Sequence, residues 1–336
     1  MKLYSVKDYL TGIKRNDKIW ISRALSLIEG RRIEQRDLSC QLISSLEKSL
    51  EKKSGKIIGV SGTPGVGKST FIDGLGYHLT EDLKLRVAVL AVDPSSIRSG
   101  GSVLGDKTRM QMLASSDLSF IRPVALSGFT GGVHPRVREM SLVLKAAGYD
   151  YVFIESVGVG QAEFDLYWMV DFFLLLIGPN EGDAIQGIKR GILEFAHHII
   201  VHKADEISKG EASITASQYQ SSLQILRSGD DFIPKVQLLS TLDALKKKKM
   251  GEVWAILQDC MKDYWKSSFF QSSLSESLKQ QLESKLKLDT IEMIMESSVF
   301  EKMREKALKE LSFGKKLPGS ISYESVKKLF QEKNLG

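Results

Sequence analysis

One glycine-rich run, placed between an apolar stretch and a helical pattern, constrains this chain more than any other feature. The segment GVSGTPGVGKST carries the spacing G-x-x-x-x-G-K-S from Gly62 to Ser69. The apolar stretch KIIGV precedes it, and a predicted helix beginning STFIDGL follows it, which is the strand–loop–helix context that the motif requires. Glycines let the backbone curl with its N–H groups pointing inward, and the helix start adds its dipole. The segment therefore predicts a cradle for the phosphates of a nucleoside triphosphate.

Two side chains of this loop have expected roles. The Lys68 ammonium is expected to reach the β- and γ-phosphates, and the Ser69 hydroxyl is expected to ligate Mg²⁺. The full set of loop residues predicted to bind the nucleotide is Gly62, Thr63, Pro64, Gly65, Val66, Gly67, Lys68, Ser69 and Thr70.

Strands and helices alternate over residues 55–245. Six apolar runs are predicted to be strands: KIIGVSG, LRVAVLAVD, YDYVFIES, DFFLLLIGP, HHIIVHKAD and KVQLLST. Several of them are apolar throughout, which is typical of strands buried on both faces of a parallel sheet. Alternation with helices predicts an α/β fold with a doubly wound, mostly parallel sheet. In such a sheet ligands bind beyond the carboxyl ends of the strands, where every motif described here falls.

The regions that flank this segment have a helical pattern. The stretch ISRALSLIEG places Ile21, Ala24, Leu25 and Ile28 on one face before Gly30 ends it. We therefore expect an N-terminal helical extension over residues 1–54, a P-loop domain over residues 55–245, and a C-terminal helical arm over residues 246–336. The four-lysine run at residues 246–249 is expected to be a solvated helix start.

Composition disfavours several partners and compartments. The net charge is +6, but the excess lysine is densest in the last third of the chain, and basic residues do not alternate with aromatic ones, so we expect no nucleic-acid partner. No window of about 18 residues is continuously apolar, so we expect no membrane span. The two cysteines are far apart and have no ligand partner at metal spacing, which favours a reducing compartment. Without a secretory pattern at the N-terminus, this predicts a cytoplasmic protein.

Two predicted strands end in carboxylates. AVLAVDPSS ends a strand at Asp93, which is suited to hold Mg²⁺ or its waters. YDYVFIESVGVGQ ends another at Glu155, which is suited to orient water or to bind a metal-bound water. A helix cap or a surface charge is the alternative for either acid.

The stretch IIVHKADE differs by one letter from the guanine-reading loop N-K-x-D. In that loop the Asp carboxylate accepts hydrogen bonds from guanine N1–H and the exocyclic amine, which adenine does not offer, so the pair discriminates strongly. The Lys stem packs along the base, and the Asn joins the loop to the phosphate region. Lys203 and Asp205 fit their roles. His202 departs from the pattern, although an imidazole can also donate a hydrogen bond. Taken alone, K-x-D after a strand is as compatible with chance as with a base pocket.

Five segments occur in a family-specific order: GVSGTPGVGKSTF, AVLAVDPSSIRSGGSVLGDKTRM, IRPVALSGFTGGV, VFIESVGVGQAE and GDAIQGIKRGILEFA. Together they resemble the MeaB/ArgK family of P-loop GTPases, the family of the mitochondrial MMAA protein within the SIMIBI class. The match is close over residues 55–205. It implies a homodimeric GTPase that uses Mg²⁺ and GTP/GDP and hydrolyses GTP slowly. It further implies a chaperone of an adenosylcobalamin-dependent acyl-CoA mutase, chiefly methylmalonyl-CoA mutase, that gates cofactor loading and protects the mutase.

The resemblance also assigns residues. The catalytic positions are Lys68, Glu155 and Gln161, and the metal positions are Ser69, Asp93 and Asp106. Gln186 and Lys189 match a third switch that senses the partner. The base pocket corresponds to His202, Lys203, Asp205, Ser240 and Thr241.

Departures from the family pattern keep alternatives open. The usual N-K-A-D is H-K-A-D, the usual S-A is Ser240-Thr241, and SGTLGGV is SGFTGGV followed by His134-Pro135. One rival is a P-loop kinase or ATPase of the ArgK transport-linked type, for which no acceptor pocket is evident in the sequence. Another is a nickel-type metallochaperone GTPase. It is disfavoured because the adjacent His197 and His198 would point to opposite faces of a strand.

Overall fold

The computed structural model of this chain describes residues 2–30, 32–49, 55–93, 109–125, 136–156, 162–181, 190–205, 208–312, 322 and 327. The chain forms two compact units. The first contains Met1–Gly30 and Glu34–Gln281, and the second contains Arg31–Ile33 and Leu282–Gly336.

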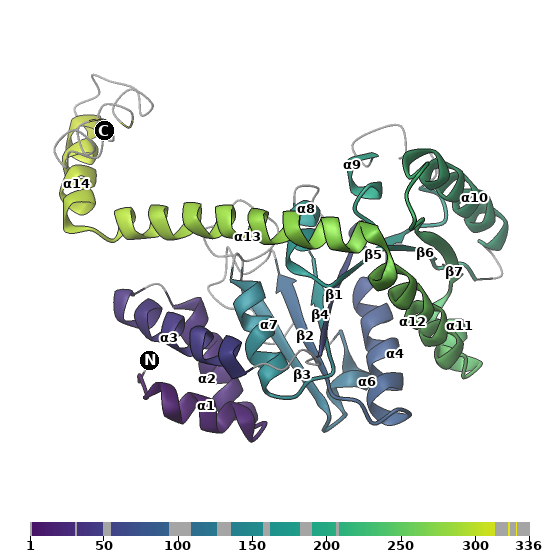
Figure 1. Cartoon of the computed structure of the whole chain (residues 1–336), viewed down its shortest axis with the longest axis horizontal. Helices are drawn as coiled ribbons and strands as arrows, with labels where there is room; N and C mark the ends of the chain where they lie inside the picture. The colour runs from purple at the N-terminus through teal and green to yellow at the C-terminus, as the bar shows by residue number, and fades with distance from the viewer. Residues whose placement is uncertain are drawn as a thin grey trace. The chain divides into compact units, whose positions relative to one another are not determined.

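Within the first unit, the described residues include a seven-stranded sheet in the order β3-β2-β4-β1-β5-β6-β7 (Figure 1). Every neighbouring pair is parallel. This confirms the predicted α/β fold with a doubly wound sheet. The strands are β1 Lys56–Gly62, β2 Val87–Asp93, β3 Ser119–Ala125, β4 Tyr151–Glu155, β5 Phe172–Ile177, β6 His198–His202 and β7 Lys235–Leu239.

The strand β3 was not among the six predicted strands. Its sequence SFIRPVA interrupts the apolar pattern with Arg122 and Pro123. Proline lacks the N–H that a central strand must donate on one side or the other, so it is found mainly on edge strands. Among the described strands, β3 lies at the edge of the sheet and has β2 as its one neighbour, with Pro123 opposite Ala91.

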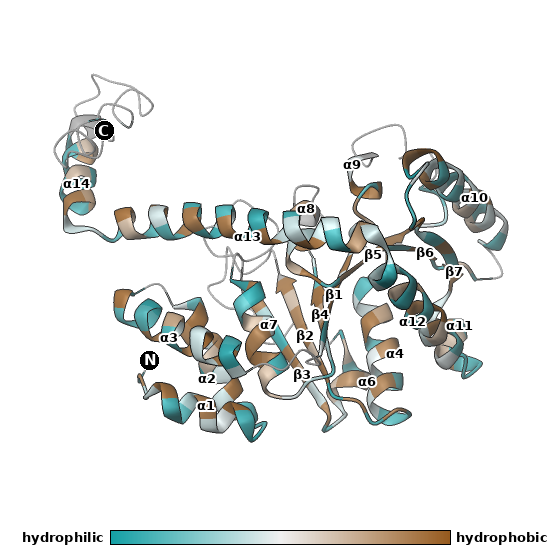
Figure 2. Ribbon diagram, in the orientation of Figure 1, coloured by the Kyte–Doolittle hydropathy of each residue, from teal (hydrophilic) through white to brown (hydrophobic). Residues whose placement is uncertain are grey.

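Helices bury both faces of the sheet, because alternate strand residues point to opposite sides. Ile57 belongs to one hydrophobic core and Ile58 to the other. The first core is covered by α1 Val6–Lys14, α2 Lys18–Glu29, α3 Ile33–Ser49, α7 Val137–Ala146, α8 Ala162–Met169, α9 Arg190–Leu193 and α10 Lys209–Leu226. The second is covered by α4 Lys68–Glu81, α6 Gln111–Ala114, α11 Thr241–Lys246 and α12 Met250–Lys266. Brown, apolar colour marks the strands between these layers in Figure 2.

The N-terminal helices begin and end at residues that satisfy their unpaired backbone groups. Ser5 and Asp8 form a capping box at the start of α1, and the Asp17 carboxylate accepts from two N–H groups at the start of α2. α2 ends at Gly30, as the sequence predicts. The apolar face predicted for this helix is fully buried.

The four-lysine run lies at the junction between two helices, so only its last residue, the N-cap Lys249, belongs to the helix start that the sequence predicts. Lys246 is the last residue of α11, and Lys249 immediately precedes α12. Between them Lys248 has a positive φ of 53°, which turns the chain. All four lysines are exposed, so the expectation that they are solvated is correct.

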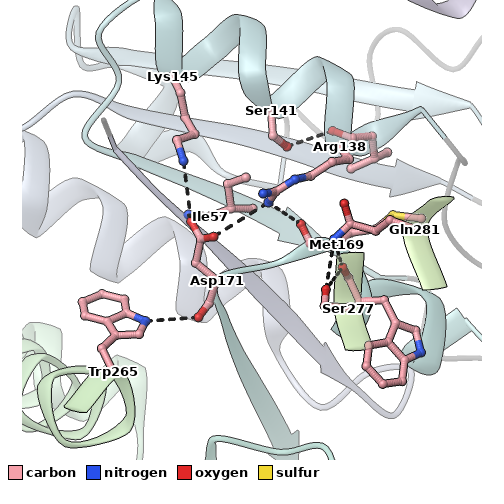
Figure 3. A network of polar contacts seen from close by, with 11 residues as sticks. Ile57, Arg138, Ser141, Lys145, Met169, Asp171, Trp265, Ser277 and Gln281 are labelled. Carbon is pink, nitrogen blue, oxygen red and sulfur yellow. Dashed lines mark hydrogen bonds and ion pairs between the residues drawn. The ribbon is translucent and has the colours of Figure 1, made fainter. Parts of the chain in front are cut away.

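Asp171 joins several elements at the amino ends of the central strands (Figure 3). Its carboxylate accepts a hydrogen bond from the Ile57 N–H at 2.9 Å and lies 3.8 Å from both Arg138 Nη1 and Lys145 Nζ. Its backbone carbonyl accepts from the indole N–H of Trp265 at 3.3 Å. The side chain of this residue thus joins β1 to α7, and its backbone carbonyl joins α12 to them.

The long helix α13, Ser268–Met295, is held to α8 by polar contacts (Figure 3). The carbonyl of Trp168 accepts from Ser277 Oγ at 2.6 Å and from Gln281 Nε2. The hydroxyls of Tyr167 and Ser273 are 2.7 Å apart. These contacts fix the first half of α13 against α8. In the second unit, α14 spans Ser298–Ser312.

Across the described residues, no helix is both long and apolar enough to cross a membrane. Both cysteines are free thiols.

Candidate functional site

The phosphate loop connects β1 to α4 through three glycines with positive φ. At Gly62, where φ is +145°, a Cβ atom would lie 2.0 Å from the carbonyl oxygen of Leu176 in β5. At Gly67, where φ is +106°, it would lie 2.6 Å from the ring of His202. Both positions therefore require glycine, for its conformation and for the space that its missing side chain leaves.

Lys68 is the first residue of α4, and its side chain is buried. Its ammonium donates to the carbonyl of Gly62 at 2.8 Å and to that of Thr63 at 3.2 Å. The positive charge is thus held against the loop itself, next to the start of a helix. A cation and helix N–H groups at one place form an electrostatic setting suited to phosphate.

Glu155 lies beside the start of α4. The Ser69 hydroxyl donates to the Glu155 carboxylate at 2.7 Å. Glu155 is the last residue of β4 and pairs with Val60 of β1, and the buried hydroxyls of Ser156 and Ser61 bond at 2.8 Å. With its hydrogen directed at Glu155, the Ser69 oxygen keeps lone pairs for a cation, and such oxygen donors suit Mg²⁺.

A further contact at the loop was not predicted. The Thr63 hydroxyl donates to the Glu181 carboxylate at 2.5 Å. Glu181 follows the carboxyl end of β5, and Tyr219 of α10 donates to its backbone carbonyl at 3.1 Å. Its position after a central strand was the available signal, since the other site residues occupy equivalent positions.

The loop after β6 lies on the phosphate loop. Lys203 has a positive φ of 58°, and its ammonium donates to the carbonyl of Gly65 at 2.8 Å. Asp205 is half-buried, and its carboxylate accepts from the backbone N–H and the hydroxyl of Ser208 at 3.3 and 3.1 Å. The hydroxyl of Ser208 also bonds to the carbonyl of Lys203. Ser208 thereby orients the carboxylate that is predicted to read guanine.

His202 is the last residue of β6 and is 4% exposed. Its Nδ1 lies 2.7 Å from the carbonyl oxygen of Val66, and its Nε2 lies 2.7 Å from the Thr241 hydroxyl. Burial lowers the pKa of the imidazole, so the ring is neutral near pH 7. Because a carbonyl can only accept, Nδ1 carries the proton, and Nε2 accepts from Thr241.

The residues after β7 complete this corner. The Ser240 hydroxyl accepts from the N–H of Asp243 at 3.3 Å and so begins α11. Thr241 is fully buried. The N–H of Ala204 donates to the carbonyl of Leu239 at 3.2 Å, which joins the ends of β6 and β7.

Several predicted site residues cannot be placed in this geometry. Asp106, Gln161, Gln186 and Lys189 lie outside the described residues. The backbone of Asp93 ends β2 opposite Ala125, but its side chain is outside the described set. Pro64, Gly65 and Thr70 are exposed, and Val66 is buried. The described predictions that meet in direct contact are the P-loop, Glu155, His202, Lys203 and Thr241.

Comparison with known proteins agrees with this geometry. A family model described as methylmalonyl Co-A mutase-associated GTPase MeaB matches residues 21–306. The chain belongs to the MeaB family. This confirms the resemblance carried by the five segments, and the protein is accordingly a P-loop GTPase.

Two proteins and one solved structure illustrate what this chain is similar to. GTPase ArgK of Escherichia coli K12 is 38% identical over 278 residues, which cover 82% of this chain and 81% of that protein. The mitochondrial methylmalonic aciduria type A homolog of Caenorhabditis elegans is 33% identical over 335 residues, which cover 97% and 83%. A crystal structure of an LAO/AO transport system kinase superposes with a TM-score of 0.68 at 28% identity and covers 98% and 99% of the two chains.

Proposed function

We propose that this MeaB-family chain is a GTP-hydrolysing chaperone of an adenosylcobalamin-dependent acyl-CoA mutase of the methylmalonyl-CoA mutase type. It gates loading of the mutase cofactor and protects the loaded enzyme. The observation that carries the proposal is the direct contact of the end of β6 and the loop after it with the phosphate loop. Lys203 bonds to Gly65, and His202 bonds to Val66. A base pocket joined in this way to a phosphate site supports a guanine-nucleotide cycle.

Recognition of the nucleotide divides between two loops. The N–H groups of the phosphate loop and the Lys68 ammonium would bind the β- and γ-phosphates. The Asp205 carboxylate, oriented by Ser208, would accept from guanine N1–H and the exocyclic amine. The Lys203 stem would pack along the base, and Ser240-Thr241 would border its far edge.

Hydrolysis would rest on the position of Glu155. Its bond to Ser69 places a carboxylate beside the phosphate end of the site, where it would orient water together with Gln161. Ser69, Asp93 and Asp106 would hold Mg²⁺. The ion, when bound, would neutralise charge on the phosphates. We expect slow intrinsic hydrolysis that the mutase stimulates, with Gln186 and Lys189 sensing the partner.

The homodimer is part of the same proposal. Leu274, Leu278, Leu282 and Leu286 recur every four residues in α13 and are 47%, 56%, 60% and 58% exposed. Residues four apart lie on one face of a helix, so these leucines form an apolar row. Such rows mark protein contacts, which supports dimerisation through the C-terminal helical arm, residues 246–336. On the sequence grounds given above, we also propose a cytoplasmic location without nucleic-acid or membrane partners.

The first test is calorimetric titration with GDP and with ADP, each with Mg²⁺. GDP should bind at least about a hundredfold more tightly than ADP. Adenine offers no donors to the Asp205 carboxylate, which would therefore stay without its hydrogen bonds in the ADP complex. Equal affinities would overturn the guanine assignment.

The second test adds purified methylmalonyl-CoA mutase and measures GTP hydrolysis. Stimulation is expected, and the Lys68→Ala variant serves as the nucleotide-site control. An unchanged rate would overturn the mutase assignment.

A kinase or ATPase of the ArgK type is the second candidate, favoured by the names GTPase ArgK and LAO/AO transport system kinase among the relatives. Transfer of a labelled γ-phosphate to a small amine would identify it.

A nickel-type metallochaperone has less support. His197 Nδ1 accepts from the Phe173 N–H at 3.0 Å, whereas His198 Nε2 faces Gln237 at 3.2 Å, so the adjacent histidines are held by different neighbours.

A further inference from the structure

We propose that His202 and Thr241 act as one hydrogen-bonded pair that replaces the asparagine of the guanine loop. The ring, in its Nδ1–H tautomer, holds the phosphate loop through the Val66 carbonyl. The Thr241 hydroxyl fixes that tautomer by donating to Nε2. Both are positioning residues, and the inference rests on the guanine-nucleotide site proposed above.

The hydrogen-bond chain runs through three elements. From β6, His202 donates through Nδ1 to the phosphate loop at 2.7 Å, and α11 supplies the Thr241 hydroxyl at 2.7 Å from Nε2. The Val66 oxygen can only accept, so the direction of the first bond is determined. A neutral ring then has one remaining acceptor, which only a donor such as a hydroxyl can satisfy. Each group in the chain is therefore paired in only one arrangement.

Two glycines make room for this chain. The ring of His202 lies where a side chain on Gly67 would sit, since a Cβ there would be 2.6 Å from Cε1 and Nδ1. The methyl group of Thr241 lies against α4, where a Cβ on Gly74 would be 2.9 Å from Cγ2. With its methyl group placed at Gly74, the threonine has its hydroxyl directed at His202. Packing thus selects the rotamer that makes the bond.

The ring is neutral in this setting. Burial lowers its pKa, and the Lys203 ammonium acts in the same direction, although the bond to Val66 opposes them. Both nitrogens already face uncharged groups, a backbone carbonyl and a hydroxyl. The pair therefore acts as a fixed hydrogen-bond link at neutral pH.

Two departures from the family pattern N-K-A-D and S-A meet in this contact. Alanine at position 241 would leave the buried Nε2 of His202 without a donor. Asparagine at position 202 would still reach Val66 but would leave the Thr241 hydroxyl without its acceptor. A buried polar group that loses its partner costs more than the pair contributes when intact. Each substitution is thus accommodated by the other.

A cycle of four proteins tests the pair: the natural chain, His202→Asn, Thr241→Ala and the double variant. Thr241→Ala should weaken GDP binding about 5- to 150-fold in the natural background, the range expected for an unpaired buried acceptor. In the background of His202→Asn the same change should have an effect of less than about threefold, because the imidazole acceptor is already gone. Equal effects in both backgrounds would overturn the proposal.

Two further variants separate the hydroxyl from the packing. Thr241→Val keeps the shape and removes the donor, whereas Thr241→Ser keeps the donor and removes the methyl group. We expect Thr241→Ser to bind GDP within about threefold of the natural chain and Thr241→Val to match Thr241→Ala. Serine and valine variants of equal affinity would contradict a role for the hydroxyl.

A measurement without nucleotide distinguishes failure of this inference from failure of the proposed function. Nitrogen-15 NMR of histidine-labelled protein, with His202→Asn identifying the resonance, should show the Nδ1–H tautomer at pH 7. An Nε2–H tautomer would overturn the pair even if GDP binds selectively. If GDP and ADP bind with equal affinity, the proposed guanine-nucleotide function is wrong. The tautomer of His202 and the comparison of Thr241→Val with Thr241→Ser then still test the proposed hydrogen bond between His202 and Thr241.

Discussion

Replacing Asp171 by asparagine should destabilise the first compact unit without altering nucleotide binding. The residue lies at the amino end of β5, whereas the phosphate loop lies at the carboxyl end of β1. Its carboxylate accepts from the Ile57 N–H and faces the cations of Arg138 and Lys145. Asparagine keeps the shape and one acceptor oxygen but removes the charge.

The expected loss follows from the contacts. A hydrogen bond to a charged group contributes about 1.5–3 kcal/mol and a neutral one about 1 kcal/mol, so roughly 1 kcal/mol is lost at Ile57. The two ion pairs are partly exposed and contribute about 0.5 kcal/mol each after solvent screening. Burial lowers the pKa of Lys145, and the Asp171 charge opposes that shift, so the lysine loses a counter-charge while 11% exposed. The total is about 2 kcal/mol.

Urea unfolding followed by tryptophan fluorescence measures this loss. Trp20, Trp168, Trp254 and Trp265 all belong to the first unit, so the signal reports that unit alone. The midpoint should fall with an unchanged slope. GDP affinity should remain that of the natural chain.

A matched control comes from an exposed pair in the same unit. Asp259 and Lys262 lie 3.2 Å apart with side chains 69% and 61% exposed, so Asp259→Asn should cost less than about 0.5 kcal/mol. In a double-mutant cycle, Asp171→Asn and Lys145→Met should be coupled by about 0.5 kcal/mol, the contribution of their ion pair. Additive effects, or a loss no larger than that of the control, would refute the reasoning.

Three further predictions concern other parts of the chain. Gly67→Ala should lower nucleotide-free stability by about 1–3 kcal/mol more than Gly65→Ala, because both have positive φ but only the first would collide with a ring; equal urea midpoints would contradict this. Burial lowers the pKa of His198 to about 4, so the folded state resists its protonation, and stability is lost as pH falls below about 6.5. His198 should account for a loss of about 2 kcal/mol in the free energy of unfolding between pH 7 and pH 5. Urea unfolding at several pH values should therefore show a weaker pH dependence for His198→Gln than for the natural chain. An equally strong dependence in both proteins would show that His198 is not the cause. Leu278→Glu should convert the proposed dimer to monomer in analytical ultracentrifugation, while the neighbouring Lys279→Glu should not, and a dimer in both would place the interface elsewhere.

The phosphate loop was predictable because its chemistry is local in the sequence. Glycine spacing, the preceding strand and the following helix all lie within residues 56–81, and the structure arranges them as expected. The strand β3 was missed because Arg122 and Pro123 obscure its apolar pattern, which an edge position tolerates. The local sequence identifies a strand well when the strand is buried on both faces, because its residues are then apolar throughout.

Contacts between residues far apart in the chain leave no mark in a local sequence pattern. Thr63 and Glu181 bond across 118 residues, and His202 and Val66 across 136. No periodicity or spacing encodes these pairs, because the sheet order brings them together. In the sequence, His202 is therefore only a departure from the asparagine of N-K-x-D. In the structure it joins the base-reading loop to the phosphate loop.

The chemistry of the substitution explains why the link survives. In asparagine and histidine alike, the δ nitrogen is three bonds from Cα, so either side chain can direct a donor to the Val66 carbonyl. The imidazole adds two atoms beyond it, which require the space at Gly67 and the hydroxyl of Thr241. Replacing asparagine by histidine at position 202 does not change the hydrogen bonds between Asp205 and Ser208.

A test of selectivity follows from this separation. His202→Asn should weaken GDP and ADP by the same factor, within about twofold, because it alters how the loops are joined and not how the base is read. Asp205→Asn should instead reduce the ratio of the two affinities by at least about tenfold, since the amide presents a donor where guanine also donates. Calorimetry of both nucleotides on both variants gives the two ratios. If His202→Asn changed the ratio as strongly as Asp205→Asn, the ring would be part of the base reader, and the division between joining and reading would be wrong.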